Sequence, residues 1–246
     1  MSLRILLCGA SGRMGRAISE VSEDYGCHIS CHVDMGDDPE SGIDDCDVVI
    51  DFSLPAATLP LARLSANAGK PMVIGTTGHK PEEKAEIVSS LSKIPVVWAG
   101  NFSTGVNLLF YLTEITARVL DIDSDFDPEV IEMHHRLKKD APSGTADRLL
   151  EILKKSRQLD EGFVMHGRSG IVGERSAQEI GSHSLRGGDV VGDHTVLFAG
   201  TGERIELTHR ATDRKIFATG ALRAAKWVVG QTPGLFSMQD VLGLVE

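Results

Sequence analysis

The stretch RILLCGASGRMG, residues 4–15, places three glycines between an apolar run and an amphipathic helical pattern. A strand, a glycine turn and a helix in this order form the first half of a βαβ unit. Gly9 and Gly12 permit a tight turn whose backbone N–H groups approach a pyrophosphate, and Gly15 lets the helix pack closely on the strand. The stretch therefore predicts a Rossmann-type fold that binds a dinucleotide.

An acidic residue, Asp34, ends the second apolar run. In this position a carboxylate hydrogen-bonds the ribose hydroxyls of a dinucleotide. The alternative is a solvated loop acid, since Asp37 and Asp38 follow it. The glycine spacing is G-x-x-G-x-x-G rather than the commoner G-x-G-x-x-G, and turns also use glycine without any ligand. Strand, turn, helix and acid together nevertheless favour dinucleotide binding.

The first hundred residues alternate between apolar β-rich runs and helical patterns, which is typical of a parallel sheet with crossover helices. The expected strands are 4–8, 28–33, 48–52, 72–75 and 96–99, and the expected helices are 14–23, 56–68 and 82–91. Three strand ends, at 51–53, 75–78 and 99–102, carry small or hydrogen-bonding residues that suit a nicotinamide and its ribose. Each of these three is also an ordinary loop sequence. The fold class is α/β.

A second domain with a different pattern follows. Apolar residues recur at helical spacing and predict a helix with one buried stripe, formed by Val106, Leu109, Phe110, Leu112, Ile115 and Val119. Strand-like runs at 130–135, 190–198 and 205–211 then surround a helix that starts near Ser143. We expect an α+β domain over 104–213 with a mostly antiparallel sheet. A helix at 216–229 and the tail 235–244 return to the first domain, assigned to 1–103 and 214–246.

The composition argues against several classes of partner. The chain has 35 acidic and 25 basic residues and a net charge of -10, which disfavours nucleic acid and anionic membranes. No apolar run is long enough to span a bilayer, and the first strand begins too early for a signal peptide, so we expect a cytoplasmic protein. Its four cysteines lie in the first fifth of the chain without a repeated pair spacing, which gives no indication of a metal site.

The segment EMHHRLKKDAPSGTA, residues 132–146, combines three kinds of chemistry. Its two histidines titrate near neutral pH and can donate protons. Its basic residues place cations where an anionic substrate needs them. Ser143 opens a helix whose free N–H groups attract a carboxylate. The segment therefore predicts a catalytic, anion-binding site.

A structural interpretation of this segment is the alternative. Ser143 is also an ordinary helix N-cap, basic loops are usually solvated, and paired histidines after a strand are often structural. A metal site is not expected, because Glu132, His134 and His135 crowd one strand, where neighbouring side chains diverge, and no distant ligand is indicated.

Taken together, these motifs resemble those of the 4-hydroxy-tetrahydrodipicolinate reductases (dihydrodipicolinate reductases) of lysine and diaminopimelate biosynthesis. The string E-x-H-H-x-x-K-x-D-A-P-S-G-T-A is the most specific. The resemblance covers nearly the whole chain, at residues 9–15, 51–53, 75–78, 101–103, 132–146, 173–175, 192–195 and 234–236.

The resemblance implies a role for each matching residue. His134 and Lys138 would donate the proton while a hydride from NAD(P)H reaches the substrate, and His135, Gly144 and Thr145 would bind the carboxylates of a small dicarboxylate. The implied cofactor contacts are Gly9, Ala10, Ser11, Gly12, Arg13, Met14, Asp34, Gly75, Thr76, Thr77, Ala99, Gly100, Asn101 and Phe102. The family is typically a homotetramer joined through sheets of the second domain.

One departure from the family concerns the cofactor. Members that use both cofactors often place an arginine directly after the ribose-binding acid, whereas Met35 follows Asp34 here. The loop after Asp34 is also short, and its two aspartates would repel the extra phosphate of NADPH. We therefore expect a preference for NADH over NADPH, with Arg13 as the remaining cation for that phosphate.

Two other functions stay open at the level of sequence. One is a two-domain oxidoreductase that acts on an aldehyde or an amino acid, although no cysteine nucleophile occurs after Cys46. The other is a redox-sensing protein that binds NADH without chemistry.

Overall fold

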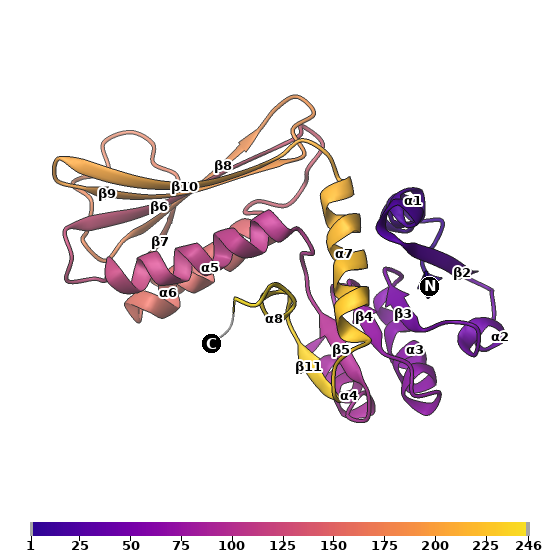
Figure 1. The fold of residues 1–246 in the computed structure, drawn as a ribbon. Helices are drawn as coiled ribbons and strands as arrows, with labels where there is room; N and C mark the ends of the chain where they lie inside the picture. Colours follow the sequence, from indigo (N-terminus) through magenta and orange to yellow (C-terminus); the bar gives the residue numbers. More distant parts are fainter. Residues whose placement is uncertain (1, 245–246) are drawn as a thin grey trace. The chain divides into compact units, whose positions relative to one another are not determined.

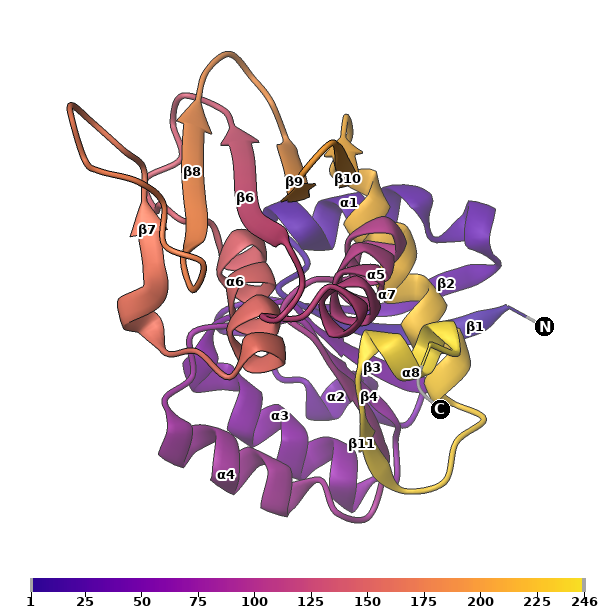
Figure 2. The same cartoon turned by 90° about the vertical axis from the view of Figure 1, so that its left-hand side faces the viewer.

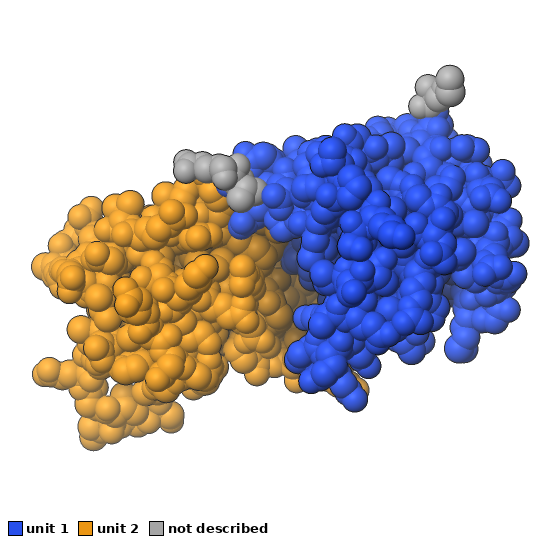
Figure 3. Space-filling model, turned by 90° about the horizontal axis from the view of Figure 1, so that it is seen from below, with its two compact units in different colours: residues 1–104, 214–246 blue, residues 105–213 orange. Residues whose placement is uncertain are grey.

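A computed structural model describes residues 2–244 of the chain, in two compact units (Figure 3). The first unit contains the residues through Thr104 and those from Arg214 on, and the second is Gly105–Asp213. Residues 1, 245 and 246, which the expected first domain includes, lie outside the described part. Each unit is described by itself below.

The first unit is built on a six-stranded parallel sheet (Figure 1). In spatial order its strands are β11 (Gly234–Phe236), β5 (Pro95–Trp98), β4 (Met72–Ile74), β3 (Val48–Asp51), β1 (Leu3–Cys8) and β2 (Cys27–Val33). The five N-terminal strands agree with the expected ones to within one or two residues, so the Rossmann-type fold is confirmed.

Helices cover both faces of this sheet, because side chains alternate along each strand. Ile5 and Leu7 of β1 belong to a core shared with α1 and α7, whereas Leu6 and Cys8 belong to a core shared with α3 and α4. The helices are α1 (Arg13–Val21), α2 (Glu40–Ile43), α3 (Pro55–Asn67), α4 (Pro81–Ser90), α7 (Lys215–Val228) and α8 (Met238–Leu242), with a 3₁₀ turn, η1, at Glu23–Tyr25.

The described residues of the C-terminal tail belong to the first unit. β11 pairs with β5 as a parallel edge strand, and Met238 and Val241 of α8 are buried in the core with α1 and α7. The sequence did not predict β11, since three residues are too few to show a period.

The second unit contains a five-stranded sheet, in the order β10, β9, β6, β8, β7. Its strands are β6 (Phe126–His134), β7 (Val164–His166), β8 (Ile180–Arg186), β9 (Gly192–Gly200) and β10 (Glu203–Ala211), with a 3₁₀ turn, η2, at Glu161–Phe163. Figure 2 shows β7, β8, β6 and β9 side by side, in the order of their pairing. The longest pairings, of β9 with β10 and with β6, are antiparallel, while β8 pairs in parallel with β6 and β7. Sequence reasoning missed β7, which is short, and β8, which is polar.

Two helices, α5 (Thr104–Val119) and α6 (Gly144–Arg157), lie along one face of this sheet (Figure 1). The expected stripe on α5 is only half right. Val106, Leu109 and Phe110 are buried, but Ile115 and Val119 are 36% and 73% exposed. At 100° per residue these two lie on the opposite side of the helix from Phe110, and Leu112, also exposed, shares that side. Among the described residues, no helix is long and apolar enough to cross a membrane.

Candidate active site

The glycine turn connects β1 to α1, and its geometry requires glycine. Gly9 has a positive φ of 77°, and a Cβ atom there would lie 2.4 Å from the carbonyl oxygen of Phe52. A Cβ atom on Gly15 would lie 2.2 Å from the carbonyl oxygen of Gly9. Gly12 is the N-cap of α1. The turn therefore lies close against α1 and the end of β3, and the first N–H groups of α1 are available to an anion.

Asp34 follows β2 and contacts this turn. Its carboxylate accepts hydrogen bonds from the Ser11 backbone N–H, at 3.0 to 3.1 Å, and from the Ser11 Oγ, at 2.9 Å. Next to it is a surface hollow of about 550 Å³, lined by Ala10, Ser11, Arg16, Ser19, Glu20, His32 and Asp34. Arg16 lines this hollow, whereas Arg13, the cation expected for the extra phosphate of NADPH, is not among the lining residues.

The three strand-end segments meet at the carboxyl edge of the sheet. A Cβ atom on Gly75 would lie 2.2 Å from the Phe52 ring, and that ring lies 5.4 Å from the ring of Phe102. Only 2% of Phe102 is exposed, so its ring belongs to the core. Contact of Phe102 with a cofactor would therefore come from the backbone.

The buried Asp51 carboxylate holds the loops at this edge together through hydrogen bonds. It is fully buried and accepts hydrogen bonds from Ser53, Thr58 and Thr76, with the two threonine hydroxyls at 2.8 and 2.9 Å. A buried carboxylate requires such donors to replace water. Asp51 thus fixes the loop that contains Thr76, and its oxygens are engaged within the protein.

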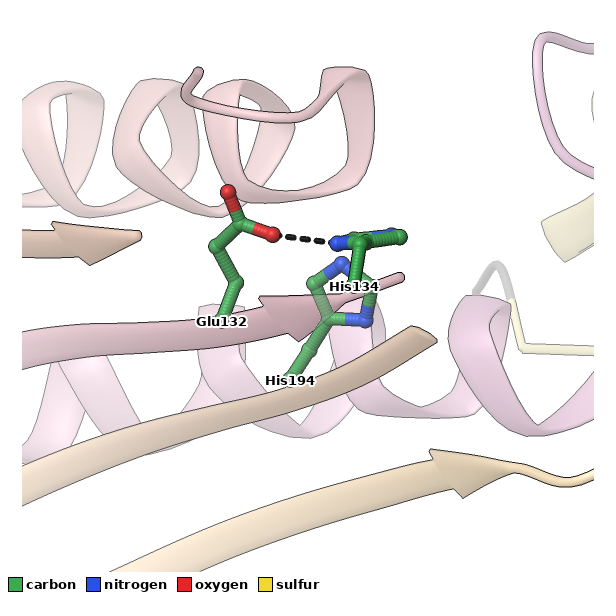
Figure 4. A group of neighbouring side chains, drawn as sticks. All are labelled: Glu132, His134 and His194. Atoms are coloured by element: carbon green, nitrogen blue, oxygen red, sulfur yellow. Dashed lines mark hydrogen bonds and ion pairs between the residues drawn. The ribbon is translucent and has the colours of Figure 1, made fainter. Parts of the chain in front are cut away.

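In the second unit, three buried polar side chains form a cluster (Figure 4). Glu132 and His134 are two residues apart on β6 and share its inner face, while His194 lies opposite Glu132 on β9. The exposed fractions are 1%, 9% and 4%. His134 Nδ1 is hydrogen-bonded to Glu132 Oε2, and the two imidazole rings meet edge to face with centroids 5.1 Å apart.

Further donors surround the Glu132 carboxylate. Its Oε1 accepts from Arg186 Nη2 at 2.9 Å and from the Ser143 backbone N–H at 3.3 Å. Burial alone would raise the pKa of Glu132, but hydrogen bonds from His134, Arg186 and Ser184 outweigh burial and lower it well below its ordinary value. Glu132 is therefore an ionised, buried carboxylate at neutral pH.

His194 has the opposite character. Burial first, and then the charge of His134, lower its pKa to about 4, so its ring is neutral at pH 7. Its Nε2 is hydrogen-bonded to the Ser143 Oγ at 3.2 Å. Ser143 Oγ also accepts from the Ala146 N–H at 3.2 Å, which confirms Ser143 as the N-cap of α6. The first residues of α6 are Gly144 and Thr145, and the N-terminus of a helix attracts anions.

The loop between β6 and α6 holds the remaining predicted residues. Lys138 Nζ is paired with Asp140 Oδ2 at 2.7 Å, and its charge also contributes to lowering the pKa of His194. His135 follows His134 beyond the end of β6, and its Nδ1 is buried without a hydrogen-bond partner among residues 2–244. A hollow of about 600 Å³ lies beside the same loop, lined by Ala141, Pro142, His166, Gly167, Ser182, His183, Ser184 and Leu185.

Comparison with known proteins identifies the family. The model of the dihydrodipicolinate reductase N-terminus matches residues 3–102, and that of the C-terminus matches residues 105–242. The chain belongs to the dihydrodipicolinate reductase family. It is 52% identical to the 4-hydroxy-tetrahydrodipicolinate reductase of Akkermansia muciniphila, over 98% of each chain. It is 46% identical to that of Aromatoleum aromaticum, over 99% of this chain and 96% of the relative.

A solved dihydrodipicolinate reductase has the same fold. The dipicolinate-bound enzyme from Paenisporosarcina sp. TG-14 is similar with a TM-score of 0.75 and 24% identity, over 98% of this chain and 99% of that one. The resemblance stated from the motifs is therefore confirmed at the level of family and fold.

His194 is the member of this buried cluster that sequence reasoning missed. The expectation of no metal site relied partly on the lack of a distant ligand, and that reason was wrong, because ligand atoms of Glu132, His134 and His194 all lie within 4.8 Å of one another. The Glu132 carboxylate already has the Arg186 guanidinium and the Ser143 N–H as partners. These contacts favour a hydrogen-bonded network over a cation site.

Proposed function

We propose that the protein reduces 4-hydroxy-tetrahydrodipicolinate to tetrahydrodipicolinate with NAD(P)H, in the cytoplasm, as a step of lysine and diaminopimelate biosynthesis. One combination of observations supports the proposal most directly. The chain matches the models of the N-terminal and C-terminal parts of the family, and it has a complete dinucleotide turn at Gly9–Gly15 and a buried His134 beside the start of α6. The names of the relatives at 52% and 46% identity support the substrate.

In this proposal the first unit binds the dinucleotide, which supplies the hydride. The N–H groups at the turn bind the pyrophosphate, and Asp34 binds the adenosine ribose. The residues assigned to the cofactor are Gly9, Ala10, Ser11, Gly12, Arg13, Met14, Asp34, Gly75, Thr76, Thr77, Ala99, Gly100, Asn101 and Phe102. Ser11 donates to both oxygens of Asp34, and a carboxylate has about four acceptor positions, so the ribose hydroxyls can donate to it as well.

The second unit binds the substrate and provides the proton. Gly144 and Thr145 at the start of α6, together with His135, bind carboxylates, because helix N-termini attract anions. Loss of the 4-hydroxyl group of the substrate as water gives a conjugated imine. Hydride addition to this imine leaves electron density that a proton must neutralise, and His134 or Lys138 donates that proton. Both carry donors in the same short segment of chain.

An assay of NADH oxidation tests this function. The substrate is the cyclised product of pyruvate and aspartate semialdehyde, and loss of NADH absorbance on its addition is the expected result. His134→Gln and Lys138→Ala should each lower kcat by about 100-fold or more, since a positioned acid contributes that much. Tight NADH binding without oxidation would instead support a redox sensor. Oxidation only with another aldehyde or amino acid would support a different reductase.

We further infer a preference for NADH over NADPH. Met35, where a phosphate-binding arginine often occurs, is 95% exposed and is followed by Asp37 and Asp38. Arg16 lines the hollow beside Asp34, and the acidic residues Glu20 and Asp34 line the same hollow. We expect kcat/KM to be higher with NADH, and Met35→Arg to raise the value for NADPH selectively. A higher kcat/KM with NADPH in the unaltered protein would contradict this preference.

We also infer a homotetramer that is joined through the outer face of the second sheet. That face carries apolar side chains at the surface: Ile131, Met165 and Leu185 are 38%, 41% and 45% exposed. It faces away from α5 and α6, because Val130 and Glu132, the neighbours of Ile131, are buried. An apolar sheet face of this kind suits a symmetric contact between copies.

A further inference from the structure

Glu132 is hydrogen-bonded both to the proposed proton donor and to the residue that caps the proposed carboxylate site. One oxygen of its carboxylate binds Nδ1 of His134, the proposed proton donor. The other oxygen binds the backbone N–H of Ser143, the residue that caps the proposed carboxylate site. With 1% of its surface exposed, Glu132 makes these contacts inside the protein.

We propose that Glu132 and His194 are positioning residues. They hold the proton donor His134 at a fixed position relative to the start of α6. Neither is assigned to contact the substrate. The inference rests on the proposed function, because it needs His134 to act as a proton donor.

The contact with Glu132 determines which nitrogen of His134 is free. An ionised carboxylate only accepts hydrogen bonds, so Nδ1 of His134 carries a proton. Nε2 is then the nitrogen that exchanges a proton with the substrate. The same carboxylate stabilises the imidazolium form through an ion pair. This is the arrangement by which an acid orients a catalytic histidine in other enzymes.

His194 supports the other side of His134. Its ring packs edge to face against that of His134, and its Nε2 is bonded to the hydroxyl of Ser143. Because this buried ring is neutral at pH 7, it adds no second positive charge beside the proton donor. Its Nδ1 has no hydrogen-bond partner among the described residues. A phenylalanine would pack here, so the polar ring indicates a role in holding Ser143.

Arg186 extends the network to the second proposed donor. Its guanidinium donates to Glu132 Oε1 at 2.9 Å and to the carbonyl oxygen of Asp140 at 2.6 Å. The Asp140 carboxylate in turn pairs with Lys138. The charged groups around His134 are therefore Glu132, Arg186, Lys138 and Asp140, with neutral His194 against its ring and His209 close to His194. Glu132 and Arg186 thus fix both His134 and the loop of Lys138.

Glu132→Gln tests the proposal, because it preserves shape and removes the charge. Glu151→Gln, an exposed glutamate of α6, is the matched control. We expect kcat of Glu132→Gln to fall by about 10- to 100-fold while NADH affinity stays unchanged. Glu151→Gln should match the wild type in both measurements.

A double mutant separates positioning from a general structural effect. In a His134→Gln background, Glu132→Gln should cause little further loss of kcat, since residues that act as a unit are not additive. A purely structural role predicts the same fold-loss in both backgrounds. Far-UV circular dichroism and NADH affinity verify folding. If Glu132→Gln does not fold, His194→Leu and His194→Gln are measured in its place. His194→Leu should raise the substrate KM. His194→Gln, which keeps a hydrogen-bond partner for Ser143, should have a substrate KM close to that of the wild type.

The outcomes distinguish this inference from the proposed function. Failure of the wild type to oxidise NADH with the substrate would overturn the proposed function. Turnover by the wild type, with an unchanged kcat in Glu132→Gln, would overturn the positioning role alone. An equal fold-decrease in kcat when Glu132→Gln is introduced into the wild type and into His134→Gln would also overturn the positioning role. Equal substrate KM values for His194→Leu and His194→Gln would overturn it as well.

Discussion

At the scale of single residues, Gly15 shows why the dinucleotide turn can be read directly from the sequence. An added Cβ atom would lie 2.2 Å from the Gly9 oxygen and 2.5 Å from the Ala10 oxygen, both of them backbone atoms. These backbone atoms could make room for a Cβ atom only if the whole turn moved. The packing of α1 on β1 therefore excludes a side chain at position 15.

We therefore expect Gly15→Ala to weaken NADH binding by at least about 10-fold and to destabilise the protein by about 1 to 3 kcal/mol. Fluorescence titration with NADH and thermal denaturation measure the two effects. Gly230→Ala is the control in the same unit, since its Cβ would lie 3.8 Å from the Trp227 oxygen, an ordinary contact. Wild-type NADH affinity in Gly15→Ala would contradict the close packing of the turn.

His194 leads to a second prediction at this scale, on stability in acid. Its pKa is lowered from 6.5 to about 4 in the folded protein, mainly by burial. Between these pH values the unfolded chain binds the proton and the folded chain does not, so stability falls as the pH falls. Acidification from pH 7 to pH 5 should remove about 2 kcal/mol through this group.

In His194→Gln this loss should be absent, and the free energy of unfolding should decrease by about 2 kcal/mol less than in the wild type over the same interval. Urea denaturation at pH 7 and pH 5 measures the difference. His28→Gln, at an exposed histidine of β2, is the control. Equal decreases in the wild type and His194→Gln would show that the buried ring does not oppose protonation.

At the scale of elements, two arginines of the connection between β7 and β8, Arg168 and Arg175, form ion pairs with β6. Arg175 pairs with Asp127 at 2.6 Å and with Glu129 at 3.3 Å, and it donates to the carbonyl oxygens of Pro128 and Glu179. Its side chain is only 19% exposed. Bonds from a charged, largely buried donor contribute more than exposed pairs do.

Arg175→Ala should therefore increase amide hydrogen exchange in residues 168–179 by about 10-fold or more, because it leaves two carboxylates and the carbonyl groups of Pro128, Ser176 and Glu179 without this donor. Mass spectrometry of the exchanged peptides gives the measurement. Arg204→Ala is the control, since Arg204 is 69% exposed and pairs with the adjacent Glu206. Unchanged exchange would mean that the other contacts of the segment suffice.

At the scale of the whole molecule, the proposed tetramer depends on one face of the second sheet. Leu185→Glu places a charge on that face, and burying it against another copy would be unfavourable without a partner. We expect the variant to dissociate into smaller species, measured by light scattering after size exclusion. Leu54→Glu, at a residue of the first unit that is 63% exposed, should not alter the mass. A tetramer in Leu185→Glu would exclude this face.

The sequence by itself determined the local features of this protein. The glycine turn, the alternation of strands and helices, and the cap at Ser143 depend on residues close together in the chain, where steric and hydrogen-bonding rules act directly. The segment 132–146 indicated the site chemistry for the same reason. Short or polar strands such as β7, β8 and β11 were not predicted, because their sequences show no clear alternation of apolar and polar residues.

The tertiary structure decided which side chains meet. The apolar pattern of α5 does not say which of its two apolar sides the sheet covers; packing buries Phe110 and leaves Val119 exposed. Likewise, the local sequence of β9 does not mark His194 as a neighbour of Glu132. The antiparallel register of β6 and β9 pairs these two residues, because register depends on the hydrogen bonds and packing of whole strands rather than on either sequence alone.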